Sequence, residues 1–194
     1  KPDGKPPCFT AETGGTGAAG YVIKLVPPCG YSIAGTGTKL GINKDEVGIL
    51  TILPFTFTFF GKNAVAAGVS ANGYLQLGGA NPLTLLEPVP VAIPTSTNPN
   101  NMIAAFWDNL APISAASDVW VATLGQAPKR VYLIQWQGWA FSNSSAPAEL
   151  VFSVFLYEGS NVIELQYTKL DGGARSTGSA ASIGIENVGG TLGL

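Results

Sequence analysis

The sequence predicts an all-β protein, an antiparallel β-sandwich of jelly-roll-like type with an irregular N-terminal arm. Three observations predict it. Short stretches alternate apolar and polar residues with a period of two, Gly, Asn, Pro and Ser interrupt them at roughly regular spacing, and helical periodicity is nearly absent. Many short strands at such spacing are typical of a sandwich or barrel. Hydrophobic residues make up 46% of the 194 residues, which is ample for a core.

The first half of the chain contains five expected strands, at 21–26, 48–53, 55–60, 64–70 and 74–77. In the third of these, Phe55, Phe57 and Phe59 share one face, which predicts that all three lie in the core. Asn72-Gly73 separates the last two, and this pair is the strongest two-residue signal for a β-hairpin.

The second half begins with a Pro-, Asn- and Thr-rich stretch at 80–101, which predicts a long surface connection. Six more strands are expected, at 102–107, 119–124, 129–136, 150–157, 162–167 and 180–186. Tyr132, Ile134 and Trp136 share a face of the third, which predicts that they point inward.

Residues 1–30 are expected to form a Gly- and Pro-rich arm, and residues 31–194 a single sandwich domain. Both cysteines, Cys8 and Cys29, belong to the arm, and each follows a Pro-Pro pair that favours exposed, extended chain. We predict that they form a disulfide, which would indicate an oxidising compartment. The alternative is two unrelated buried thiols.

Composition excludes several function classes. The net charge is −2 and only 11% of residues are charged, so the clustered cations of a nucleic-acid or polybasic membrane surface are missing. The sequence has no His, which excludes Ser-His-Asp catalysis and His-ligated metal sites. No stretch is long and apolar enough for a membrane span. Such a low content of charged residues suits a protein whose surface is covered by other copies of the same protein, or a protein that is fixed outside the cell.

An ordered series of motifs resembles the pattern of nidogen-like extracellular domains, which also occur as β-sandwich modules of secreted and surface proteins of bacteria. The motifs are Phe59–Gly61, Val69–Leu75, Ile103–Asp108, Val131–Trp136, Phe152–Tyr167 and Ile183–Asn187. The resemblance covers about residues 47–194. It implies an extracellular, non-catalytic module and no particular ligand.

Two candidate sites follow from residue types. Asp108, Asn109 and Asp118 supply oxygen atoms of the kind that calcium binds, but the chain lacks the dense D-x-D-x-D spacing of a recognisable calcium loop. The alternative is that Asp108, beside a buried Trp107, accepts hydrogen bonds from backbone N–H groups. Trp139 follows a glycine at a strand end, and it is the tryptophan expected to expose its ring for stacking on a ligand. No set of residues forms a convincing catalytic constellation.

We therefore expect a secreted, non-enzymatic structural or adhesive module that self-associates through its N-terminal arm into a surface assembly or filament. The alternative is an accessory module that binds a glycan or an extracellular protein. Neither reading involves nucleic acid or membrane insertion. The arm itself has two alternatives, because it either connects to a neighbouring subunit or lies along an edge of its own sandwich.

Overall fold

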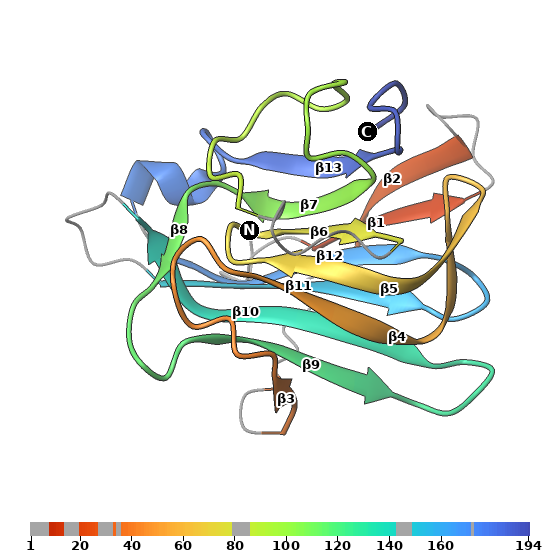
Figure 1. Ribbon diagram of the computed structural model, residues 1–194, viewed down its shortest axis with the longest axis horizontal. Helices are drawn as coiled ribbons and strands as arrows, with labels where there is room; N and C mark the ends of the chain where they lie inside the picture. The colour runs from red at the N-terminus through yellow and green to blue at the C-terminus, as the bar shows by residue number, and fades with distance from the viewer. Residues whose placement is uncertain are drawn as a thin grey trace.

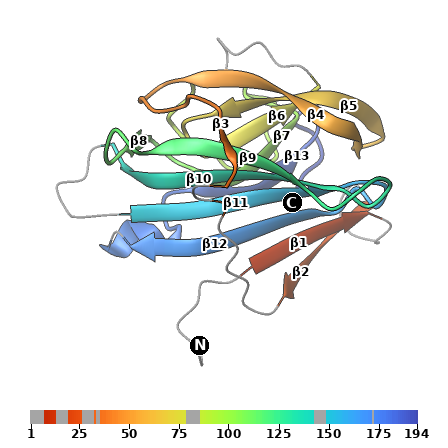
Figure 2. The same ribbon diagram turned by 90° about the horizontal axis from the view of Figure 1, so that it is seen from below.

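The computed structural model describes residues 8–13, 20–26, 33, 36–78, 86–142, 149–171 and 173–194. Two antiparallel sheets lie face to face, and Figure 2 shows them as two layers. The prediction of an all-β sandwich is therefore confirmed. Among the described residues, no helix is long and apolar enough to cross a membrane.

The smaller sheet follows the order β13-β7-β6-β5-β4 (Figure 1). Its strands are β4 (Gly48–Phe59), β5 (Lys62–Ser70), β6 (Tyr74–Leu77), β7 (Met102–Trp107) and β13 (Ser182–Glu186). Sequence neighbours pair from β4 to β7, so this sheet is largely a meander. The predicted hairpin at Asn72-Gly73 joins β5 to β6, and a side chain at Gly73 would clash with the Phe106 carbonyl oxygen, 2.1 Å from its Cβ position.

The larger sheet follows the order β2-β1-β12-β11-β10-β9-β3, with β8 paired to β10. Its strands are β1 (Cys8–Thr13), β2 (Tyr21–Val26), β3 (Thr38–Lys39), β8 (Leu110–Pro112), β9 (Asp118–Leu124), β10 (Val131–Phe141), β11 (Glu149–Tyr157) and β12 (Ile163–Asp171). A short 3-10 helix, η3 (Gly173–Thr177), follows β12. Strands β9 to β12 form a second meander, whereas a jelly roll would alternate its strands between the sheets.

The core lies between the sheets and follows the predicted alternation. Phe55, Phe57 and Phe59 are 7%, 0% and 1% exposed. Tyr132 and Trp136 of the facing sheet belong to the same buried cluster, where Trp136 stacks on Phe152 at 5.0 Å. Both predictions of inward-facing residues are confirmed.

The segment between β6 and β7 contains the long connection that the sequence predicts. Residues 86–101 contain no strand, and they cover part of the outer face of this sheet. Val91 and Ile93 pack there against the buried side chains of Tyr74, Met102 and Trp107.

Three strands were not predicted, namely β1 and the short strands β3 and β8. β1 pairs antiparallel with β12 of its own sheet and with β2 on its other side. Residues 8–13 therefore follow the second alternative for the arm, since they lie along their own sandwich.

Candidate functional site

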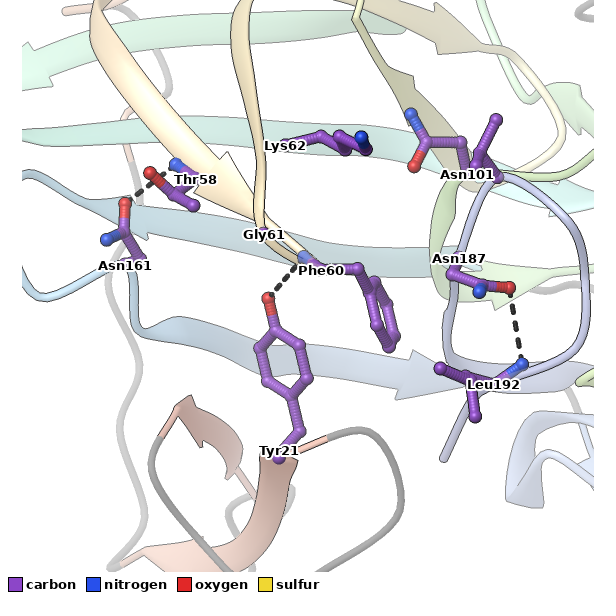
Figure 3. A pocket seen from close by; sticks show the side chains of 11 residues that line it. Tyr21, Thr58, Phe60, Gly61, Lys62, Asn101, Asn161, Asn187 and Leu192 are labelled. Carbon is purple, nitrogen blue, oxygen red and sulfur yellow. Dashed lines mark hydrogen bonds between the residues drawn. The ribbon is translucent and has the colours of Figure 1, made fainter.

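One end of the sandwich carries a pocket of about 490 Å³ (Figure 3). Five chain segments meet there: the start of β2, the β4–β5 turn, the residue before β7, the β11–β12 turn and the segment after β13. Its lining residues are Gly20, Tyr21, Thr58, Phe60, Gly61, Lys62, Asn101, Asn161, Asn187, Val188 and Leu192. A smaller hollow of about 240 Å³ shares Lys62, Asn101 and Val188 with it, so the pocket continues along the surface.

The backbone around the pocket adopts unusual conformations. Phe60 and Gly61 form the two-residue β4–β5 turn with φ of 46° and 73°. Such turns need positive φ at both positions and favour Asn-Gly, so a phenylalanine is strained there. Asn101 and Asn161 have φ of 56° and 53°. Four described non-glycine residues have positive φ, and three of them line this pocket. Backbone strain clusters at functional sites, which makes this pocket the leading candidate.

Aromatic packing holds the strained turn in place. The Phe60 ring lies 4.8 Å from the Tyr21 ring and 4.7 Å from the Phe59 ring, measured between centroids. The Phe60 amide donates a hydrogen bond of 3.3 Å to the Tyr21 hydroxyl, and Figure 3 shows this hydroxyl directed at the amide. Burial raises the pKa of Tyr21, so the hydroxyl stays neutral. Phe60 is only half-buried, which leaves part of its ring for a ligand.

Three asparagine amides shape the pocket wall by binding the backbone. Asn161 Oδ1 accepts from the Thr58 amide at 2.8 Å, and Asn187 Oδ1 accepts from the Leu192 amide at 3.2 Å. Asn101 Nδ2 donates to a main-chain carbonyl at 2.6 Å, while its Oδ1 has no hydrogen-bond partner among the described residues. Each amide has more donors and acceptors than these bonds use. The wall is therefore fixed in place and still able to bind polar groups.

The pocket carries positive charge in an acidic chain. Among the described lining residues, Lys62 is the one charged side chain, and none is a carboxylate. Lys62 is exposed and makes no ion pair within the described part of the chain. The arrangement can hold a ligand by hydrogen bonds, ring contact and charge.

The structure explains Asp118, one of the three calcium candidates, by hydrogen bonds. Its Oδ1 accepts from the amides of Gly41 at 3.0 Å, Ile42 at 2.9 Å and Val119 at 2.8 Å. Asp118 is 2% exposed and closes the loop before β4 onto the start of β9. Asp118 Oδ1 therefore holds the loop before β4 against the start of β9.

The other two candidates are adjacent in the chain, and Asp108 is buried and paired with a cation, whereas Asn109 is half-buried. Arg175 of η3 donates to Asp108 Oδ1 at 2.7 Å and lies over the Phe141 ring at 4.4 Å. Asp108 Oδ2 and Asn109 Oδ1 are buried without a hydrogen-bond partner among the described residues. No group of three or more His, Cys, Asp or Glu gathers there or elsewhere in the described ranges. Calcium binding at Asp108, Asn109 and Asp118 stays a prediction.

The expectation that Trp139 exposes its ring is wrong. Trp139 is 0% exposed and its Nε1 donates to the Asp118 carbonyl at 3.3 Å. The cause is an irregularity of β10 between Gln137 and Trp139, where Gly138 has φ of 71°. This bulge inserts one residue, so the inward phase that runs through Trp136 continues at Trp139.

The predicted disulfide falls largely outside the described residues. Cys29 is not among them, and only the backbone of Cys8 is. Cys8 lies opposite Val26 in the β1–β2 register, and Cys29 follows Val26 by three residues. The disulfide stays a prediction.

Reasoning from the sequence did not find the pocket as a site. Its residues come from five separate turns or strand ends, and none carries a motif of catalysis or metal binding. One signal was available, because Phe60-Gly61 occupies a hairpin turn where Asn-Gly is the favoured choice. Phe60, Gly61 and Asn187 also belong to the motifs that carry the nidogen-like resemblance.

A comparison with protein-family models finds one described as NIDO related, which matches residues 29–194. This match confirms the nidogen-like resemblance and extends it to include the segment before residue 47. Comparisons with curated proteins and with solved structures give no match.

Proposed function

Because the chain belongs to the NIDO-related family, whose domains are typically extracellular, we propose that it is an extracellular, non-catalytic module that binds a glycan in the pocket at the end of the sandwich. The observation that carries the proposal is the clustering of positive-φ residues around an open pocket, at Phe60, Asn101 and Asn161, with strain at Phe60. The lining supports a saccharide as the ligand class.

The chemistry of the lining matches a sugar in three ways. Amide groups on several sides exchange hydrogen bonds with hydroxyl groups. The half-buried Phe60 ring offers an apolar face for the C–H groups of a pyranose. Lys62, with no carboxylate among the described lining residues, favours a sugar that carries an acidic group. We therefore expect acidic glycans to bind more tightly than neutral ones.

A glycan array that holds acidic and neutral saccharides tests this proposal. We expect the wild-type protein to retain acidic glycans. Lys62→Gln removes the charge and should weaken this binding about tenfold, while Lys44→Gln, an exposed lysine before β4, should leave it unchanged. Lack of binding to any glycan, or equal loss in both variants, would contradict the proposal.

Phe60→Asn separates a binding role from a structural one. Asn at this position relieves strain of about 1–2 kcal/mol but loses ring contacts worth about 0.5–1.5 kcal/mol each, so the free energy of unfolding should change little. Glycan binding should be lost. If the variant binds as the wild type does, the ring is only structural.

Self-association through residues 1–30, the leading expectation from the sequence, receives less support than glycan binding. The described part of the arm contains β1 and β2, and β1 uses both of its edges for β12 and β2 of the same chain. A connection to a neighbouring subunit would therefore have to use β2, the terminal strand of the larger sheet, or residues outside the described ranges. Deleting residues 1–20 and measuring both the circular dichroism and the molar mass in solution distinguishes the two roles. A connecting arm would make assembly, but not folding, depend on these residues, whereas an arm that belongs to its own sandwich would make folding depend on them.

A further inference from the structure

The smaller sheet has one covered edge and one open edge. At the covered edge, the main chain of Ile185 in β13 exchanges two hydrogen bonds with Leu194, each of 3.0 Å. At the other edge, β4 has no described strand beyond it. β4 spans 12 residues and contains no charged side chain. Edge strands usually carry charges that prevent pairing with another chain, so this edge lacks the common protection.

The alternation of hydrogen bonds along β4 shows which of its residues direct their backbone N–H and C=O groups to the open edge. The Ala71 amide donates to the Val47 carbonyl at 2.8 Å, and the register pairs Ile49 with Val69. Odd-numbered residues of this stretch therefore bond to β5, and the N–H and C=O groups of Leu50 and Ile52 point to the open edge.

The side chains at this edge are apolar and exposed. Leu50 is 42%, Ile52 70% and Val65 of the neighbouring strand 61% exposed. Elsewhere on the outer face of this sheet, Val91 and Ile93 of the long connection cover β6 and β7. An open backbone ladder and an uncovered apolar strip therefore coincide along the start of β4.

We propose that a second copy of this chain pairs with this edge, β4 against β4, about a two-fold axis at Thr51. In that register Leu50 of each copy exchanges N–H···O bonds with Ile52 of the other. The pattern is self-complementary, as a two-fold interface requires. Pro54 lacks an N–H and ends the ladder. The pairing joins two sheets into one and places the exposed strips of both copies side by side.

This dimer does not depend on glycan binding. The pocket takes only Thr58 from β4, at the other end of the strand, and its outward amide is already bonded to Asn161 at 2.8 Å. Either proposal can therefore fail without the other.

Sedimentation equilibrium of the full chain tests the proposal. We expect the wild type to approach twice the 20.0 kDa of one chain as its concentration rises. Ile52→Lys places a cation in the paired edge and should weaken the dimer about tenfold or more. Val89→Lys, at a 61% exposed residue of the long connection, is the matched control and should dimerise normally.

Hydrogen exchange locates the contact. The amides of Leu50 and Ile52 should become protected as the concentration rises, and Ile52→Lys should abolish this dependence. A wild type that stays monomeric at every concentration overturns the proposal. So does a dimer that Ile52→Lys leaves intact, and circular dichroism excludes misfolding of either variant.

Discussion

The two ends of the sandwich use polar side chains in different ways. At the end with the Asn72-Gly73 turn, buried polar groups bind the backbone: Asn72 Oδ1 accepts from the Leu110 amide at 3.1 Å, and Asp118 accepts from three amides. At the pocket end, Asn101 and Asn161 bind the backbone with one part of their amides and line an open space. The same residue types therefore close one end of the molecule and leave the other able to bind.

This difference shows why residue type alone is a poor guide to a site. The carboxylates that suggested a metal lie at the closed end, where backbone amides bind Asp118 Oδ1 and Arg175 binds Asp108 Oδ1. The pocket end is marked instead by backbone conformation and by uncovered amide and aromatic surface.

The largest effect is expected at the closed end. Asp118→Ala removes the carboxylate oxygen that three amides share and leaves the buried amides of Ile42 and Val119 without this acceptor, which should lower the free energy of unfolding by about 3–5 kcal/mol. Asp118→Asn keeps an acceptor and should cost less, and urea denaturation measures both. If Asp118→Ala lowers the free energy of unfolding by less than about 1 kcal/mol, Asp118 does not hold the loop before β4 in place.

Reduction of the predicted Cys8–Cys29 disulfide should have the next largest effect. The bond would close a loop of about 22 residues, and its loss costs roughly 3 kcal/mol in the chain-entropy model. Thermal unfolding with and without reductant measures this, and a Cys8→Ser/Cys29→Ser variant is the control that reductant should not affect. Two free thiols in the non-reduced protein would exclude the bond.

Glu158, beside the pocket, should make the protein less stable in acid. Arg130 donates to it from the side chain at 2.9 and 2.6 Å and from the backbone at 2.9 Å, and these bonds lower the pKa of Glu158 from 4.5 to about 2. The stability they provide is present above pH 4.5 and is lost as the pH falls toward 2. Glu158→Gln should flatten this part of the curve of Tm against pH. An unchanged slope would show that the pair contributes nothing.

Glu186, also at the pocket end, should have the opposite and smaller dependence. Burial raises its pKa, which a 2.9 Å hydrogen bond from the Thr95 amide only partly offsets. As the pH rises above 4.5, the Glu186 carboxyl ionises in the unfolded chain before it does in the folded protein. The stability that the protonated carboxyl contributes is therefore lost between pH 4.5 and the raised pKa of the folded state. Glu186→Gln should therefore gain stability relative to the wild type toward neutral pH. A constant difference in Tm across this range would contradict the shift.

The sequence predicted the features that depend on local alternation. Phe57 and Trp136 are buried as expected because each lies in an uninterrupted period-two run. The same period predicts that Trp139 points outward, but the bulge at Gly138 shifts the alternation by one residue and turns Trp139 inward. A single glycine in the sequence is a weak signal for such a bulge. β1 escaped prediction because its short run, from Cys8 to Thr13, mixes polar and apolar residues without a clear period.

The pocket could not be predicted because its residues share no local pattern. Thr58, Asn101 and Asn161 come together only through the pairing of strands that are distant in the chain. Their positive or extended backbone conformations follow from turn geometry, which composition does not encode. Only the unusual Phe60-Gly61 turn carries a local signal.

The most direct test of the contrast between the ends is a titration of the protein's backbone amides by NMR, with glucuronic acid as the acidic probe and glucose as the neutral one. We predict that glucuronic acid shifts the amides of Phe60, Lys62 and Asn161 and that glucose does so more weakly, while the amides of Asn72 and Asp118 stay unchanged. Shifts confined to Asn72 and Asp118, or no shifts with either sugar, would contradict the account.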